Sequence, residues 1–369
     1  MVLTGCRLLL GDCLEVMRTM PDASVDAVVT DPPYGLAFMG KRWDYDVPTT
    51  EVWTECLRVL KPGGHLLAFA GTRTQHRMAV RIEDAGFEIR DMIAWVYGSG
   101  FPKSLDVSKA IDRMAGVDRE VGPVDPARAA RLVNQQGSYE TEQGWSAGGR
   151  RVTIDPPATP EAQQWAGWGT ALKPALEPIT MARKPLSEGT VAANVLAHGT
   201  GGINVDGCRV GTELSPSGEL TSLGRWPANL IHDGSDEVVG LFPQQQSGAN
   251  PTRRGGLGYH GAAGQDTCHA PRGTDSGSAA RFFYMAKASR SERDPGNTHP
   301  TVKPLDLMAY LCRLVTPPWG LVLDPFMGSG TTGKAAMGEG ARFVGIERDP
   351  AYLAIAEKRL NRAQIGLPL

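Results

Sequence analysis

The sequence predicts an α/β protein with a doubly wound, mostly parallel sheet that is circularly permuted and interrupted by a large irregular insertion. Two observations predict this fold. Short apolar runs alternate with helix-length amphipathic segments at both ends of the chain. When residues 321–369 are read before residues 1–97, the alternation is continuous. A permutation of this kind requires the two chain ends to lie close together, as domain termini often do.

The first region, residues 1–115, contains four expected strands, at residues 6–10, 25–29, 65–70 and 87–97. Helices are expected through residues 14–17, 49–60 and 72–85. The second helix ends at Lys61-Pro62-Gly63-Gly64, which is a strong stop signal because proline and glycine disfavour continued helix.

The second region, residues 116–280, is rich in Gly, Pro, Ser, Thr and Gln and shows few clear periods. It is far too long for an ordinary loop in a compact domain. Its apolar content includes the runs at 191–196 and 229–231 and four tryptophans: Trp145, Trp165, Trp168 and Trp226. We interpret this region as an inserted, irregular recognition region.

The third region, residues 281–369, returns to a regular pattern. Strands are expected at residues 282–285, 321–323 and 342–346. Helices are expected at residues 305–315, from the glycine-rich loop to about 339, and at 351–361. The helix at 305–315 has a single apolar stripe, formed by Leu307, Tyr310, Leu311 and Leu314.

Composition limits the class of protein. The net charge of −2 gives no global nucleic-acid signature, so a DNA-binding surface has to be a local basic patch. Six cysteines are scattered without a CxxC pair, which favours a reducing cytosol and hence a cytoplasmic location. No apolar run approaches the length of a membrane span, and the first residues lack the apolar core of a signal peptide.

The loop Thr30-Asp31-Pro32-Pro33-Tyr34-Gly35 follows the apolar strand at 25–29. Two consecutive prolines fix φ and remove two amide donors, so the loop is stiff. The Asp31 carboxylate, the Pro32 carbonyl and the Tyr34 ring are therefore held together at the carboxyl end of a strand. Ligands of open α/β sheets bind at this end.

A second loop, Gly328-Ser329-Gly330-Thr331-Thr332-Gly333, fits the pattern GxGxxG between a strand and a helix, and Glu347 ends the next strand. This arrangement suits any ligand that contains adenosine, because an acidic side chain there can bind both ribose hydroxyls. The loop lacks the lysine of a P-loop. A nicotinamide enzyme is disfavoured because only one strand–helix–strand–helix unit follows before the chain ends.

The sequences DPPY and DPFMGSGTT, in this order, resemble the beta group of S-adenosylmethionine-dependent DNA amino-methyltransferases. The resemblance covers about residues 5–100 and 281–362. It implies a Rossmann-like sheet of the seven-stranded methyltransferase type, S-adenosyl-L-methionine as cofactor and double-stranded DNA as partner. It also implies that the region between the two motifs, residues 116–280, recognises the target.

The resemblance further implies a cofactor pocket. Asp12 neighbours the adenine, Glu347 the ribose and the 326–330 loop the methionine moiety, while residues 299–304 supply another part of the pocket. The expected cofactor-binding residues are Asp12, Asp31, Thr301, Lys303, Asp324, Phe326, Gly328, Ser329, Gly330, Thr331 and Glu347. Other roles stay open: Asp12 is also suited to cap a helix, the glycines to pack a helix on a strand, Glu347 to form a surface salt bridge and Lys303 to be solvated.

The expected catalytic residues are Asp31, Pro32, Pro33 and Tyr34. An exocyclic amine of a base is a poor nucleophile because its lone pair is delocalised into the ring. The Asp31 carboxylate and the Pro32 carbonyl can hold its hydrogens and direct the lone pair. Tyr34 can stack on a base flipped out of the duplex.

The expected activity is transfer of a methyl group to N6 of adenine in DNA, because in the resembling family an Asp at the first motif position favours adenine. Cytosine-N4 methylation is the first alternative; enzymes of the resembling family with that activity more often have Ser at this position. Methylation of protein glutamine or RNA and non-enzymatic DNA binding are further alternatives. A cytosine-C5 enzyme is excluded because none of the six cysteines follows a proline.

The remaining features give weaker expectations. The spacing of Cys208, His260, Cys268 and His269 fits no standard zinc pattern, so no metal is expected. Two arginine groups, Arg253-Arg254 and residues 281–293, suit either phosphate contacts or a solvated face. Phe101 is a candidate for a loop near the target base. The resembling family includes dimers, and an enzyme with a restriction endonuclease partner and an orphan enzyme fit the sequence equally well.

Overall fold

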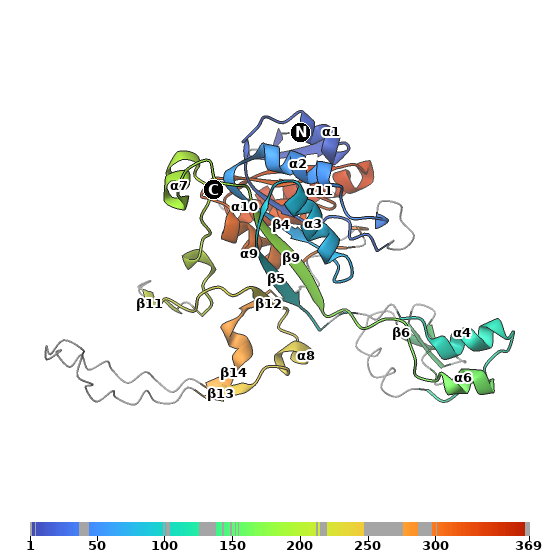
Figure 1. Ribbon diagram of the computed structural model, residues 1–369. Coiled ribbons are helices and arrows are strands. Elements are labelled where there is room, and N and C mark those ends of the chain that lie inside the picture. The colour runs from blue at the N-terminus through green and yellow to red at the C-terminus, as the bar shows by residue number, and fades with distance from the viewer. Residues whose placement is uncertain are drawn as a thin grey trace, which may run out of the picture. The chain divides into compact units, whose positions relative to one another are not determined.

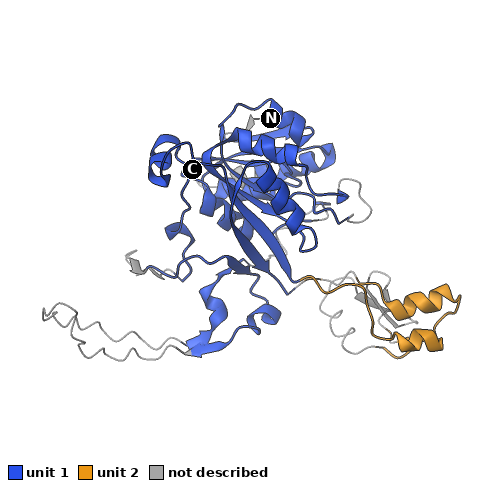
Figure 2. Ribbon diagram, in the orientation of Figure 1, with its two compact units in different colours: residues 1–99, 175–369 blue, residues 100–174 orange. Residues whose placement is uncertain are grey.

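The computed structural model describes residues 2–3, 5–36, 44–98, 100, 104–124, 138–141, 144–147, 150–151, 153, 155–211, 213–214, 220–246, 276–286, 297–299 and 301–365. The chain forms two compact units, one of residues 1–99 with 175–369 and one of residues 100–174 (Figure 2). Among the described residues, no helix has the length and apolar character needed to cross a membrane.

The larger unit is built on a ten-stranded sheet (Figure 1). Its strands lie in the spatial order β1 (Val2–Leu3), β2 (Cys6–Leu10), β17 (Arg342–Glu347), β16 (Leu321–Asp324), β3 (Val25–Thr30), β4 (Leu60–Phe69), β9 (Leu176–Arg183), β5 (Glu88–Val96), β12 (Leu230–His232) and β15 (Tyr284–Met285). The strands from β2 to β4 are mutually parallel, and β9 is antiparallel to both of its neighbours. The seven strands from β2 to β5 confirm the predicted methyltransferase type of sheet.

The predicted permutation is also confirmed. The strands β16 and β17, from the end of the chain, lie between β2 and β3, from its beginning. Leu10 of β2 pairs with Glu347 of β17, and Val28 of β3 pairs with Leu323 of β16. Parallel neighbours end at the same edge of a sheet, so the loops that follow β2, β3, β16 and β17 share one edge.

Helices cover both faces of this sheet. One face packs against α9 (Leu305–Val315), α10 (Thr331–Gly338) and α11 (Pro350–Ile365), and the other against α1 (Cys13–Arg18), α2 (Thr50–Val59) and α3 (Gln75–Asp84). Successive strand residues face opposite sides: Val29 and Leu67 join the first core, whereas Val28 and Leu66 join the second. Continuously apolar strands are the expected signature of a sheet buried on both faces.

The other elements of the larger unit are short. They are α7 (Val191–His198), α8 (Asp236–Val239), two 3-10 helices (Asp206–Cys208 and Ala279–Phe282), and two strand pairs, β10 (Glu213–Leu214) with β11 (Leu220–Ser222) and β13 (Gln244–Gln246) with β14 (Ser276–Ser278). The strand predicted at 282–285 is therefore reduced to Tyr284–Met285, following a 3-10 turn.

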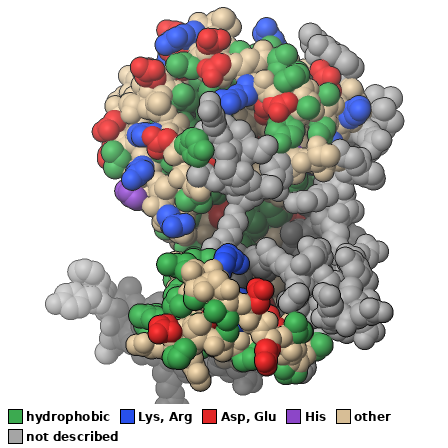
Figure 3. Space-filling model, turned by 90° about the vertical axis from the view of Figure 1, so that its right-hand side faces the viewer, with side chains coloured by type: hydrophobic (Ala, Val, Ile, Leu, Met, Phe, Trp, Pro, Cys, Tyr) green, Lys and Arg blue, Asp and Glu red, His purple; other side chains and the backbone are tan. Residues whose placement is uncertain are grey.

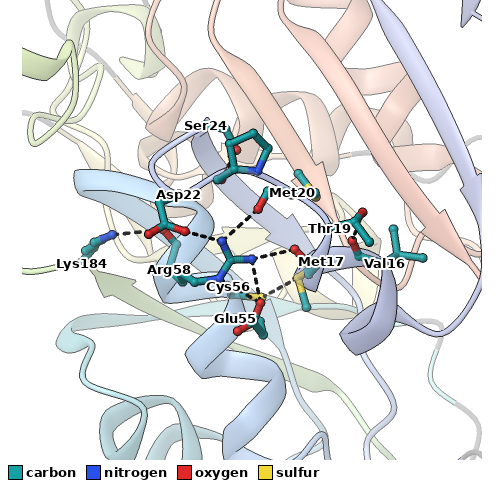
Figure 4. Close-up of polar contacts among 11 residues, drawn as sticks. Val16, Met17, Thr19, Met20, Asp22, Ser24, Glu55, Cys56, Arg58 and Lys184 are labelled. Atoms are coloured by element: carbon teal, nitrogen blue, oxygen red, sulfur yellow. Dashed lines mark hydrogen bonds and ion pairs between the residues drawn. The ribbon is translucent and has the colours of Figure 1, made fainter.

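Arg58, near the end of α2, binds the end of α1 and the turn that follows it (Figure 4). Its guanidinium donates to the carbonyls of Met17 at 2.7 Å and Met20 at 2.9 Å. It also pairs with Glu55 at 2.8 Å and with Asp22. These contacts tie the end of α1 and the turn after it to the end of α2.

The middle of the chain differs from the prediction. The compact unit begins at residue 100 and ends at 174, whereas the sequence analysis placed a single insertion at 116–280 with boundaries at 1–115 and 281–369. Residues 176–183 form β9 inside the sheet, between β4 and β5. The sequence analysis missed β9 because both of its partners are distant in the chain and because Pro178 within it argues against a central strand.

The smaller unit contains α4 (Val107–Met114), α6 (Pro160–Gln164) and a sheet of β6 (Ser138–Thr141), β7 (Gly144–Ala147) and β8 (Arg150–Arg151). Buried Asp112 accepts hydrogen bonds from the Arg119 guanidinium and from the amides of Ala158 and Thr159. Charged side chains of both signs lie among hydrophobic ones on the face of the molecule shown in Figure 3, in line with the net charge of −2.

Candidate active site

The loop after β3 is held in place by Asp44, which is buried. Its carboxylate accepts the amides of Tyr34 at 2.7 Å, Gly35 at 3.0 Å and Leu36 at 3.2 Å. The Thr74 hydroxyl donates to the Tyr34 carbonyl at 2.6 Å. The two prolines therefore do not act alone in fixing the loop. Nothing in the sequence indicated Asp44, because no motif links it to residues 34–36.

Asp324 joins the two predicted motifs directly. Its carboxylate accepts the hydroxyl of Thr30, 294 residues away, at 2.7 Å. It also accepts the Thr332 hydroxyl at 2.6 Å and the Phe326 amide at 3.0 Å. Asp324 is only 1% exposed, and burial raises its pKa to about 6 although these hydrogen bonds oppose the rise. Asp324 is thus a buried hydrogen-bond acceptor that links the end of β3 to the end of β16.

The glycine-rich loop after β16 requires its glycines. Gly328 and Gly330 have φ values of +54° and +83°, which L side chains rarely adopt. A Cβ on Gly328 would lie 2.9 Å from His299 Nε2, and one on Gly330 would lie 3.0 Å from Ala356 Cβ. The Gly328 amide donates to Glu347 Oε2 at 2.9 Å. The predicted pairing of this loop with Glu347 at the end of β17 is therefore present.

Arg359 of α11 holds the same loop through hydrogen bonds, a role that the sequence analysis did not predict. Its guanidinium is buried and donates to the Ser329 carbonyl at 2.6 Å, the Ser329 hydroxyl at 2.9 Å and the Thr331 hydroxyl at 3.1 Å. Ser329 and Thr331, both predicted to bind the cofactor, are therefore also tied into the protein. The only available signal was an arginine next to the apolar Leu360 on the last helix.

Asp12 follows β2 at the same edge of the sheet. Its side chain accepts the Leu14 amide at 3.0 Å and caps α1, so the capping role is confirmed while the cofactor role stays a prediction. The Gly11 amide donates to the Glu347 carbonyl at 3.0 Å, and Glu347 Oε1 accepts the Asp349 amide at 2.8 Å. The structure therefore places Asp12, Glu347 and the glycine-rich loop together.

Two other predicted residues lie differently. Phe326 packs toward the core, with its ring centroid 6.4 Å from that of Trp53. Thr301 is exposed, and its carbonyl accepts the His299 Nδ1–H at 2.6 Å. Burial lowers the pKa of His299, which keeps this imidazole neutral beside the glycine-rich loop at neutral pH.

Lys303 is the centre of a partly buried network with Asp31, Tyr34 and Glu177. Its ammonium lies 2.9 Å from Asp31 Oδ2, 3.0 Å from Glu177 Oε2 and 3.0 Å from the Tyr34 hydroxyl oxygen, and its side chain is 10% exposed. Burial alone would lower the pKa of Lys303, but Asp31 and Glu177 raise it above its usual value. Lys303 is thus a paired ammonium group and not a solvated one.

The Tyr34 hydroxyl completes this network. It lies 2.7 Å from Asp31 Oδ1 and 3.0 Å from Glu177 Oε2. Burial and the two carboxylates raise the pKa of Tyr34, so it stays a neutral phenol. Sequence analysis missed Glu177 because it lies in β9, the strand that was not predicted; a glutamate inside an otherwise apolar run was the signal.

Several weaker expectations concern residues outside the described ranges: Phe101, Arg253, Arg254 and the His260, Cys268 and His269 group. Cys208 lies in the apolar core, and burial raises the pKa of its thiol to about 11. Arg281 donates to the carbonyls of Gly277 and Ser278 and lies over the Phe282 ring. In the described part of the chain, no group of three or more His, Cys, Asp or Glu residues is arranged to hold a metal ion.

The profile of the DNA methylase family matches residues 25–115 and 260–358, which is more than half of the chain and includes both motifs. The chain belongs to the DNA methylase family. This family comprises N6-adenine and N4-cytosine DNA methyltransferases. The DNA methylase is thus an S-adenosyl-L-methionine-dependent DNA methyltransferase. The turn of Gly328 and Gly330 and the carboxylate of Glu347 fit an adenosine-containing cofactor at the end of β16 and β17.

The chain is also similar to individual proteins. The DNA methylase is 26% identical to the Type II methyltransferase M.HindIII of Haemophilus influenzae over 314 residues, which is 84% of this chain and 68% of the relative. It is similar to the crystal structure of the M1.HpyAVI–SAM complex, with 18% identity, 96% and 99% of the two chains covered and a TM-score of 0.43. It is also similar to the cytosine-N4-specific PvuII DNA methyltransferase, with 15% identity, 97% and 93% covered and a TM-score of 0.44.

Proposed function

We propose that this DNA methylase is a site-specific enzyme that methylates the exocyclic N6 amine of adenine. The observation that carries the proposal is the position of Asp31. It is the first residue of DPPY, it lies at the sheet edge that also carries the glycine-rich loop, and Thr30 beside it bonds to Asp324 of the cofactor motif. An Asp at this position favours adenine in the resembling family, in which Ser is more often found in cytosine-N4 enzymes.

The reaction requires a delocalised amine to become a directed nucleophile. Asp31 and the Pro32 carbonyl accept the two amine hydrogens, which favours a pyramidal nitrogen with its lone pair directed away from both acceptors. Pro33 and Asp44 keep the backbone of the loop rigid, so the Asp31 and Pro32 positions are set before the base arrives. The Tyr34 ring supports the extruded base by stacking. When bound, S-adenosylmethionine supplies an electrophilic methyl group.

The cofactor residues act through their shared edge of the sheet. Glu347 would hold the ribose hydroxyls of the cofactor, and Asp12 would lie beside its adenine. Gly328 and Gly330 allow close approach of the backbone to the ligand. Lys303 and Asp31 connect this pocket to the target amine. The remaining predicted residues shape the pocket through contacts within the protein. Ser329 and Thr331 accept hydrogen bonds from Arg359, and Asp324 accepts them from Thr30 and Thr332. Phe326 packs toward the core, and the Thr301 carbonyl holds His299.

Nucleoside analysis of DNA methylated by the purified enzyme tests the proposal. Duplex DNA is incubated with labelled S-adenosylmethionine, digested and separated by chromatography. The proposal predicts label in N6-methyldeoxyadenosine. Label in N4-methyldeoxycytidine would establish the cytosine alternative instead. Absence of label from both nucleosides would overturn DNA as the substrate.

The proposal extends to partners and location. Double-stranded DNA is the substrate, and residues 116–174 and parts of 184–280 contribute to recognition of the target site. The exposed pair Trp165 and Trp168, with centroids 5.0 Å apart, offers aromatic surface in this region. Homodimerisation and a cognate restriction endonuclease, or the absence of one in an orphan enzyme, are further proposals. A cytoplasmic location accords with Cys6, Cys13, Cys56, Cys208 and Cys312, which are free thiols.

A further inference from the structure

We infer that Glu177 is a positioning residue for methyl transfer. Its carboxylate accepts the hydrogen bond of the Tyr34 hydroxyl and thereby leaves Asp31 Oδ1 free to accept a hydrogen bond from the target amine. This inference rests on the proposed function and adds a residue of β9 to the site. Glu177 lies neither in the DPPY motif nor in the glycine-rich loop. It pairs with Trp95 of β5 in the sheet register, and its carboxylate lies in the Lys303 network.

The hydrogens of this network can be counted. The Lys303 ammonium has three N–H groups, and three acceptors lie within 3.0 Å of it: Asp31 Oδ2, Glu177 Oε2 and the Tyr34 oxygen. The Tyr34 hydroxyl has one hydrogen but two carboxylate acceptors, Asp31 Oδ1 at 2.7 Å and Glu177 Oε2 at 3.0 Å. It can therefore donate to only one of them at a time.

When Tyr34 donates to Asp31, both oxygens of Asp31 are engaged, Oδ2 by Lys303 and Oδ1 by the phenol. A carboxylate oxygen that already accepts a strong hydrogen bond is a poorer acceptor for an incoming amine. Rotation of the Tyr34 O–H toward Glu177 releases Oδ1 while the phenol keeps a charged acceptor. The O–H bond of Tyr34 does not break in this change, because only the hydrogen-bond acceptor is exchanged. Lys303 holds the side chains of Asp31, Glu177 and Tyr34 in place.

Glu177 is itself held for this role. The ring of Tyr97 lies against Trp95, with centroids 4.8 Å apart, and its hydroxyl forms a hydrogen bond with Glu177. Burial and Glu177 raise the pKa of Tyr97, so Tyr97 also stays a neutral donor. Without the Glu177 carboxylate, Asp31 would be the sole anionic acceptor for the Tyr34 hydrogen, and the phenol would remain on Oδ1.

A double-mutant cycle tests the inference. Single-turnover methyl transfer to duplex DNA is measured at saturating cofactor for wild type, Glu177→Gln, Tyr34→Phe and the double variant. Glu177→Gln is expected to slow transfer about tenfold, the effect of one weakened charge-assisted hydrogen bond. Tyr34→Phe keeps the ring but removes the competing hydroxyl, so Glu177→Gln in that background is expected to change the rate by less than about twofold.

Glu88→Gln is the matched control. Glu88 lies on β5 and pairs with Arg183 of β9 at 2.6 Å, so its substitution also disturbs β9 but leaves the Lys303 network intact. It is expected to retain the wild-type rate. Cofactor dissociation constants and thermal unfolding are measured for every variant, which separates a slower step from weaker binding or lost folding.

Two results would overturn the inference: a wild-type rate in Glu177→Gln, or rate losses that multiply in the double variant. In both cases the wild-type enzyme still methylates DNA, so the result bears on the role of Glu177 and not on the proposed function. If the wild-type enzyme transferred no methyl group to DNA, the proposed function would fail and this inference with it.

Discussion

Substitution of Thr30 by valine tests the link between the two motifs. Valine has nearly the same shape, and Thr30 is fully buried, so the change removes the hydroxyl that donates to Asp324 at 2.7 Å without leaving a large cavity. A hydrogen bond to a charged group contributes about 1.5–3 kcal/mol and a neutral one about 1 kcal/mol. At pH 7.5, where Asp324 is ionised, Thr30→Val should lower the free energy of unfolding by about 2 kcal/mol.

The loss should depend on pH. The folded-state pKa of Asp324 is raised to about 6, above its ordinary value, so the fold is more stable when Asp324 is protonated and loses stability as the pH rises from about 4 to 6. Thr30→Val removes a hydrogen bond that lowers this pKa and therefore raises it further. At pH 5 the loss should fall to about 1 kcal/mol, because the lost hydrogen bond is then to a neutral carboxyl.

Equilibrium urea unfolding followed by circular dichroism at pH 7.5 and pH 5 measures both values. Thr54→Val is the control, because Thr54 is exposed on α2 and its hydroxyl donates to the Thr50 carbonyl of the same helix at 3.0 Å. It should change the free energy of unfolding by less than about 0.5 kcal/mol. The reasoning is refuted if Thr30→Val costs no more than Thr54→Val, or if its cost is the same at both pH values.

Two further substitutions probe the cofactor loop and the α1–α2 contact. Gly328→Ala places a Cβ 2.9 Å from His299 at a residue with left-handed backbone, so calorimetry should show about tenfold weaker S-adenosylmethionine binding. Gly338→Ala is the control, because a Cβ there meets no atom within 4 Å, and this variant should bind as wild type. Equal affinities of the two variants would contradict the account. Arg58→Ala should lower the free energy of unfolding by about 2 kcal/mol without changing the methyl-transfer rate of the folded enzyme. Arg18→Ala is the control, because Arg18 is exposed, and it should change the free energy of unfolding little. A slower methyl-transfer rate in Arg58→Ala would count against a purely structural role.

Much of the fold follows from local sequence signals. Apolar runs bounded by proline and glycine identified β3, β4, β16 and β17, because strands buried on both faces need continuous apolar residues. The order of DPPY and the glycine-rich loop predicted that two segments almost 300 residues apart share one sheet edge. The hydrogen bond between Thr30 and Asp324 shows that they do.

Other parts depend on tertiary contacts that local patterns do not encode. The strand β9 pairs with β4 on one side and β5 on the other, and neither strand is near residues 176–183 in the chain. Glu177, Asp44 and Arg359 were missed for the same reason. Each is an isolated charged residue whose partners, Lys303, the 34–36 amides and Ser329, lie elsewhere in the sequence.

The most direct measurement of the central claim compares wild type with Asp31→Ala in single-turnover methyl transfer to duplex DNA, alongside calorimetric binding of S-adenosylmethionine. In the proposed mechanism Asp31 supplies an acceptor for the target amine, whereas Glu347 would hold the ribose of the cofactor and the 326–330 loop its methionine moiety. The account predicts that Asp31→Ala binds the cofactor within about fivefold of wild type but transfers methyl groups at least about 1,000-fold more slowly. Transfer at an undiminished rate would contradict it.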